Sequence, residues 1–83
     1  MNAPTTADEI AEALRELGQE ADVADIKDRV QANRGGRPPQ YASEWSYRCT
    51  IQGIINRHCP QSASYAFVTP TFEKVSRGRY RLA

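Results

Sequence analysis

The chain has 83 residues, of which 40% are hydrophobic and 25% are charged. A chain of this length forms one small domain and lacks the room for a cofactor-binding sheet beside a substrate domain. No apolar run approaches the roughly 18 residues that a membrane span needs, and residues 1–9 lack the basic and apolar regions of a signal peptide. We therefore expect a single cytoplasmic domain over residues 1–83, with residues 1–5 disordered.

The net charge of +1 hides a strong asymmetry along the chain. Residues 1–30 carry eight acids and three bases, a sum of −5, whereas residues 31–83 carry eight bases and two acids, a sum of +6. Seven of those eight bases are arginine, whose planar donors suit phosphate groups and guanine edges. The pattern favours nucleic-acid binding by the second half, the alternative being a solvated surface whose charges happen to segregate.

Two helices are predicted in the first half of the chain. Thr6–Glu9 has the form of a capping box, and the apolar residues after it recur at helical spacing. This pattern predicts a helix over residues 7–17, ended by Gly18. Asp22 is a candidate cap for a second helix over residues 23–32, which the glycines and prolines of residues 35–39 terminate.

A third helix is predicted over residues 44–58, capped by Ser43, and its two faces differ in character. The face expected to meet the core carries Tyr47, Ile51, Ile54, Ile55 and His58. The opposite face carries Trp45, Ser46, Cys49, Gln52, Gly53 and Asn56. A mid-helix glycine costs about 1 kcal/mol relative to alanine, so Gly53 indicates either insertion into a groove or tight packing against another helix.

The C-terminal segment alternates apolar and polar residues around an Arg-Gly turn, which predicts a β-hairpin over residues 72–82. Its apolar contacts are expected from Phe72, Val75, Tyr80 and Leu82. Its bases, Lys74, Arg77, Arg79 and Arg81, are expected to face water or a polyanion. In the preceding connection, residues 59–71, we expect Tyr65, Phe67 and Val68 to anchor the loop or form a short strand.

Three helices followed by a hairpin is the order of a winged helix-turn-helix, so the predicted fold class is α+β. The string FEKVSRGRYRL over residues 72–82 resembles the wing of winged-helix domains attached to bacterial restriction endonucleases and related chromatin-associated proteins. Residues 50–59, with Tyr41 upstream, resemble the Thr-Ile-x-x-x-Ile segment of the same group. The connection over residues 60–71 departs from that pattern.

The resemblance implies a module that binds double-stranded DNA near the bacterial nucleoid. It further implies an N-terminal recognition domain of a larger restriction nuclease, and we hypothesise that the target carries a modified base such as methylated cytosine. The third helix would enter the major groove, and the hairpin would lie along the backbone or an adjacent minor groove.

Candidate contact residues follow from this docking geometry. For base edges we expect Trp45, Ser46, Cys49, Gln52, Asn56 and Arg57. For the DNA backbone we expect Arg34, Arg37, Arg48, Lys74, Arg77 and Arg79. For Trp45, a place in the core at the start of the helix is an equal alternative.

The sequence is also compatible with two functions other than DNA recognition by a restriction system. A winged helix that binds another protein and the DNA-binding domain of a transcription regulator are the alternatives. Catalysis by this chain is not expected, because adjacent residues such as His58 and Cys59 point about 100° apart on a helix. Cofactors and metals are not expected either. The two cysteines, about 15 Å apart on one helix, are expected to be semi-buried thiols without a disulfide.

Overall fold

The first helix, α1 (Ala7–Leu17), has the predicted bounds. We describe a computed structural model covering residues 4–83. The Thr6 hydroxyl accepts a hydrogen bond from the Glu9 N–H at 3.2 Å, which satisfies one unpaired donor of the first turn. The helix ends at Gly18, whose φ of 113° suits glycine far better than any other residue. The Thr6 cap and Gly18 therefore operate locally, as the sequence predicts, but the Glu9 carboxylate pairs with Arg34 and the expected reciprocal half of the capping box is not formed.

Helix α2 (Val23–Asn33) also forms where it was predicted, but its start differs in detail. Asp22 occupies the N-cap position without forming a side-chain cap. Its carboxylate instead accepts a hydrogen bond from Arg79 at 2.8 Å. The expected cap is thus replaced by an ion pair to the hairpin, because an arginine lies within reach.

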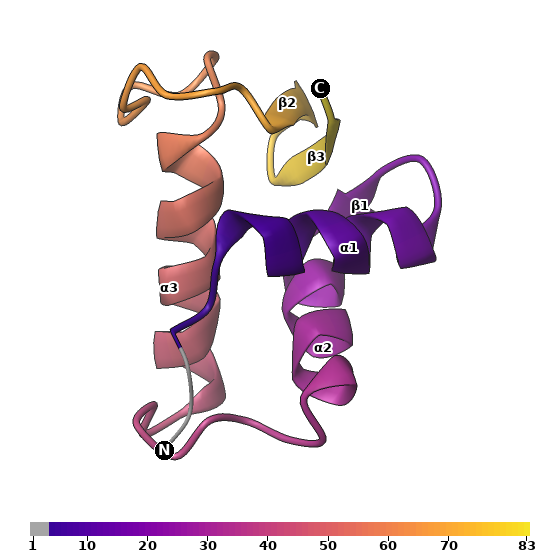
Figure 1. Cartoon of the computed structure of the whole chain (residues 1–83), viewed down its shortest axis with the longest axis vertical. Coiled ribbons are helices and arrows are strands. Elements are labelled where there is room, and N and C mark those ends of the chain that lie inside the picture. The colour runs from indigo at the N-terminus through magenta and orange to yellow at the C-terminus, as the bar shows by residue number, and fades with distance from the viewer. Residues whose placement is uncertain (1–3) are drawn as a thin grey trace.

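Helix α3 (Glu44–Arg57) begins at Ser43 with a reciprocal capping box between Ser43 and Ser46. It runs beside α2, and residues 34–43 connect the two helices (Figure 1). Helix α1 lies across both and packs against each of them. The predicted inner face is confirmed for Tyr47, Ile51, Ile54 and Ile55, which are all buried.

The sheet has one strand more than the predicted hairpin. Strands β2 (Phe72–Ser76) and β3 (Arg79–Leu82) form the hairpin, and β1 (Ala21–Asp22) pairs with β3 on its other side. All pairings are antiparallel, in the order β1-β3-β2. A two-residue strand has no periodicity to detect, which is why sequence patterns missed β1.

The hairpin contains a bulge between Lys74 and Ser76. Val75 lies at this irregularity and is 39% exposed, so its expected role as an apolar contact was wrong. An extra residue in one strand interrupts the alternation of side chains between the two faces. Phe72 and Tyr80 do bury their rings as predicted.

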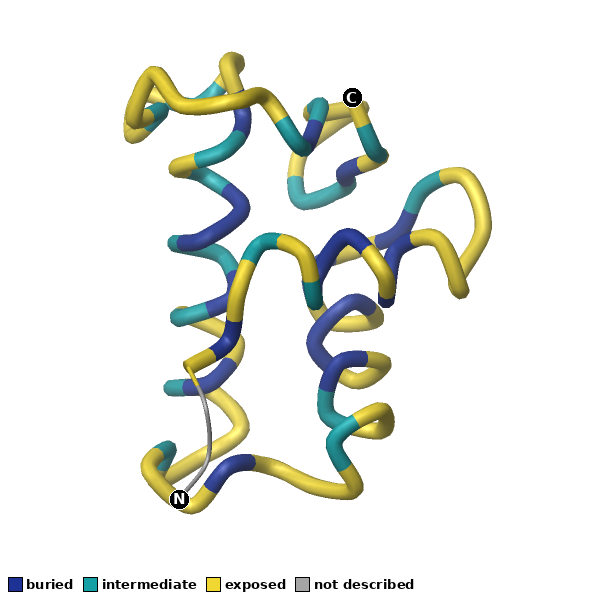
Figure 2. Tube along the Cα trace, viewed as in Figure 1, coloured by how far each residue is buried: buried dark blue, intermediate teal, exposed yellow. Residues whose placement is uncertain are grey.

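The core lies where the three helices and the sheet meet (Figure 2). Its largest fully buried side chains are Tyr47, Phe72, Ile10, Leu14, Ile26, Ile51 and Ile55. Thr5 is also buried, and its hydroxyl lies 3.3 Å from that of Tyr47. This contact contradicts the expected disorder at Thr5, whereas residues 1–3 of that segment lie outside the described residues.

The end of α3 and the connection after it correct several expectations. Phe67 is 89% exposed and Val68 is also exposed, so neither side chain is buried in the core and neither residue forms a strand. His58 is half-buried, and its Nδ1 atom is buried without a hydrogen-bond partner in residues 4–83. Cys49 is exposed and Cys59 is buried, so neither thiol is semi-buried.

The architecture is α+β, with three helices and a small three-stranded antiparallel sheet within the described range. Strand β1 between the first two helices, and its pairing with β3, are compatible with a winged helix. Within residues 4–83, every helix is too short or too polar to cross a membrane.

Candidate nucleic-acid interface

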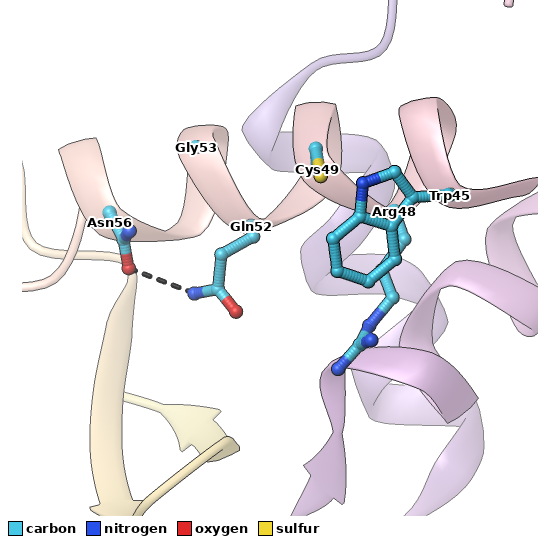
Figure 3. A pocket seen from close by; sticks show the side chains of 6 residues that line it. All are labelled: Trp45, Arg48, Cys49, Gln52, Gly53 and Asn56. Carbon is cyan, nitrogen blue, oxygen red and sulfur yellow. Dashed lines mark hydrogen bonds between the residues drawn. The ribbon is translucent and has the colours of Figure 1, made fainter.

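The outward face of α3 forms a shallow hollow of about 320 Å³. Figure 3 shows its lining, with the indole and the guanidinium at one end and the two amides at the other. The lining residues are Trp45, Arg48, Cys49, Gln52, Gly53 and Asn56. The structure therefore brings together four of the predicted base-contact residues and one predicted backbone contact.

A second hollow of about 390 Å³ lies between α3, the following connection and the hairpin. It shares Gln52 and Asn56 with the first, so the two adjoin along one surface. Lys74 and Arg77 line it from the hairpin. We call the two hollows together the α3–hairpin face.

Gln52 fixes the hairpin against α3. Its Nε2 atom donates to Asn56 Oδ1 at 2.9 Å and to the Tyr80 hydroxyl at 3.0 Å. The alternation in residues 72–82 predicts Tyr80 only as an apolar contact and does not indicate this polar one. Tyrosine combines an apolar ring with a polar hydroxyl. A tyrosine on a strand expected to pack near the polar face of a helix could therefore have indicated a hydrogen bond between them.

The bases on and beside this face are unpaired, in contrast to the bases on the rest of the protein. Seven of the eleven bases form ion pairs with carboxylates. The other four, Arg48, Arg57, Lys74 and Arg77, form none within residues 4–83. All four come from α3 or the hairpin. Neither hollow is lined by an acidic residue, so positive charge is uncompensated there.

Three predicted backbone contacts are instead held by carboxylates elsewhere in the fold. Arg34 pairs with Glu9. Arg37 pairs with Glu44 at 2.5 Å. Arg79 pairs with Glu20 at 3.1 Å and with Asp22.

The partners of Arg34 and Arg79 come from distant segments that the tertiary fold brings close, which charge counting along the sequence cannot foresee. The structure does not place these three arginines in the α3–hairpin face. Arg81, expected to face water or a polyanion, likewise pairs with Glu73.

The remaining predicted base contacts lie at or beyond the edges of the hollows. The Ser46 hydroxyl accepts from the Ser43 N–H and donates to the Ser43 carbonyl, so it serves the helix cap. Arg57 is exposed at the end of α3 and lines neither hollow.

Trp45 is 67% exposed, which removes the alternative that it belongs to the core. The Arg48 guanidinium lies 5.5 Å from the centre of its ring, within the range of a cation–π contact. The indole and the guanidinium thus form one flat, exposed edge of the first hollow.

Gly53 has no neighbour that explains it. A Cβ atom added there would meet nothing within 4 Å in the described structure. Tight packing against another helix of this chain is therefore excluded as its reason. The backbone of α3 at Gly53 is open to close approach from outside.

No group of three or more metal-ligating side chains occurs in the part of the chain that the structure describes. Comparisons with family models, with curated proteins and with solved structures find no match to this chain.

Proposed function

We propose that this protein is a winged helix-turn-helix module that binds double-stranded DNA. In this proposal α3 enters the major groove, and the β2–β3 hairpin is the wing that follows the backbone. The observation that carries the proposal is the set of four unpaired cations around a face without carboxylates. A surface of this kind attracts a polyanion, whereas the paired charges elsewhere are already neutralised.

The side chains of the face divide into two roles. Lys74 and Arg77 on the wing and Arg48 on α3 suit phosphate groups, which position the protein without reading sequence. Gln52 and Asn56 suit base edges, because amide side chains can pair bidentately with adenine. Nε2 of Gln52 already makes two hydrogen bonds, so the second amide, Asn56, is the stronger candidate for reading bases.

A salt titration with a duplex of mixed sequence tests the proposal. The logarithm of the binding constant should fall against the logarithm of salt with a slope of roughly −3 to −5, as expected for a handful of phosphate contacts. Arg77→Ala should make the slope about one unit shallower. Arg15→Ala is the matched control, because Arg15 lies on α1 and pairs with Glu12. Absence of binding, or equal effects of the two variants, would reject this interface.

Binding to another protein is a second candidate function, favoured by the exposure of Trp45. Exposed tryptophans are enriched among residues that dominate protein interfaces. Trp45→Ala in the duplex assay separates the two functions. If the face binds DNA, Trp45→Ala should bind the duplex more weakly than the unsubstituted chain does. If the face binds only another protein, the unsubstituted chain itself should not bind the duplex.

Attachment to a restriction nuclease and recognition of a modified base derive from the sequence resemblance and stay predictions. A competition between unmodified and cytosine-methylated forms of one duplex tests the second. A methyl group in the major groove can be read by apolar contact, and the Trp45 indole is a candidate surface for it.

A further inference from the structure

The connection between α3 and β2 carries an exposed aromatic turn over residues 65–68. The Phe67 side chain is the most exposed large hydrophobic group in residues 4–83, at 89%. Phe67 is also the one non-glycine residue in that range with a positive φ, at 58°. A bulky residue is unfavourable in this conformation, and such strain persists only where the surrounding structure holds it.

Specific contacts hold this aromatic turn in place. The Tyr65 hydroxyl donates to the Val68 carbonyl, and the Tyr65 and Phe67 rings lie with their centres 5.2 Å apart. The Ala66 N–H donates to the Arg57 carbonyl at 3.0 Å. The connection therefore folds back onto the C-terminal end of α3, where it begins its path across to the hairpin (Figure 1). The result is a braced turn that presents Phe67 to solvent.

The surroundings of the aromatic turn indicate the chemistry of its partner. Residues 59–71 contain no acidic side chain, and the turn is bonded to the backbone of Arg57, one of the four unpaired cations. Gln61, Ser62 and Ala63 of the same connection line the second hollow together with Lys74 and Arg77. The aromatic turn therefore begins two residues after Ala63, the last residue of the connection that lines this hollow. An exposed apolar ring on a segment without acids, bonded to the backbone of an unpaired arginine, matches nucleic acid, which offers base faces next to phosphates.

We propose that Phe67 is a wedge that inserts at a base step of duplex DNA, beside the segment contacted by α3, and partly unstacks that step. This inference rests on the proposed function and adds a second contact element to it. Phenylalanine is among the side chains that wedge between base steps from the minor groove. The fixed, outward position of the ring suits this role, because little ordering of the turn is then needed on binding.

The test uses the full chain and duplexes that carry 2-aminopurine at successive positions, since this base fluoresces more strongly when it is unstacked. The unsubstituted protein should raise the fluorescence at one position flanking the α3 site. Phe67→Asn should abolish that rise and weaken binding about tenfold, a typical contribution of one stacking contact. Asparagine tolerates a positive φ, so this variant keeps the turn. Phe67→Leu should retain most of the rise, because leucine is also a wedging side chain.

The readouts separate this inference from the proposed function. Phe67→Asn should leave the salt slope unchanged, whereas Arg77→Ala should make the slope shallower and leave the fluorescence rise in place. If Phe67→Asn changes neither affinity nor fluorescence while Arg77→Ala weakens binding, the wedge is rejected and the DNA-binding function stands. If the unsubstituted protein binds no duplex, both are rejected.

Discussion

The side-chain amide of Gln52 on α3 donates a hydrogen bond to the Tyr80 hydroxyl on β3 across 3.0 Å. The two residues are 28 positions apart, and the contact joins the helix to the hairpin at the point where the two hollows meet. Within residues 4–83 this contact is one of two polar links between α3 and the hairpin, the other being the Phe72 N–H, which donates to the His58 carbonyl at the end of α3 at 3.1 Å.

Tyr80→Phe should weaken duplex binding several-fold, because the wing loses its side-chain link to the middle of α3 while the ring stays buried. The free energy of unfolding should fall by about 1 kcal/mol, the usual net value of one hydrogen bond. Tyr47→Phe is the matched control, since it removes the hydroxyl contact to Thr5 away from this face. It should lower stability to a similar degree and leave DNA affinity unchanged. Equal losses of affinity in the two variants would contradict a positioning role for Tyr80.

Gly53→Ala should raise the stability of the protein and lower its affinity for duplex DNA. The added methyl group has open space and improves helix propensity, so the free energy of unfolding should rise by about 1 kcal/mol. Duplex affinity should fall, because the methyl group occupies the surface that a DNA groove would approach. The converse control is Ala24→Gly on the exposed side of α2, which should lower stability and leave affinity unchanged. A more stable Gly53→Ala protein with full affinity would show that α3 is not approached closely there.

The pKa of Glu44 is lowered to about 2 by hydrogen bonds from Lys27 and then Arg37. Because the folded state favours the charged carboxylate, the resulting stabilisation is complete above the ordinary pKa of 4.5. It is lost as the pH falls toward 2. Urea unfolding of the unsubstituted protein and of Glu44→Gln should therefore give stabilities that differ above pH 4.5 and converge toward pH 2. Curves that stay parallel through this interval would contradict the ion-pair assignment.

Arg34 should prove to be a structural residue. Its side chain is 19% exposed, pairs with the Glu9 carboxylate, and also donates to the Pro4 carbonyl at 3.3 Å. Arg34→Ala should lower the free energy of unfolding by about 2 kcal/mol, between the values for exposed and buried pairs. Duplex binding measured under conditions where the variant is folded should keep its salt slope. A slope one unit shallower would instead place Arg34 on the DNA.

Much of the architecture was predictable because its determinants are local. The Thr6 cap, Gly18 and the Ser43 cap set three helix boundaries through contacts within a few residues. The alternation of apolar and polar residues over 72–82 predicts the hairpin, and the helical spacing of 100° per residue predicts the buried side of α3. The prediction failed at β1, where two residues carry no period, and at Val75, where a bulge breaks the alternation.

The sequence predicts which helix face carries the candidate site, but it does not predict which basic side chains near that face stay unpaired. Trp45, Cys49, Gln52 and Asn56 share a face because they share a helix. Which arginines stay unpaired depends on carboxylates from distant segments, such as Glu9 for Arg34 and Glu20 for Arg79. The exposure of Phe67 also depends on how the connection folds back onto α3.

The sequence by itself determined the three helices, the hairpin and the polar side of α3, because caps and periodicity act over a few residues. Only the tertiary structure decided that Arg29, Arg34 and Arg79 are neutralised, because their carboxylate partners are distant in the chain and adjacent in space. It also decided that Gln52 meets Tyr80, which turns a helix face and a hairpin into one surface.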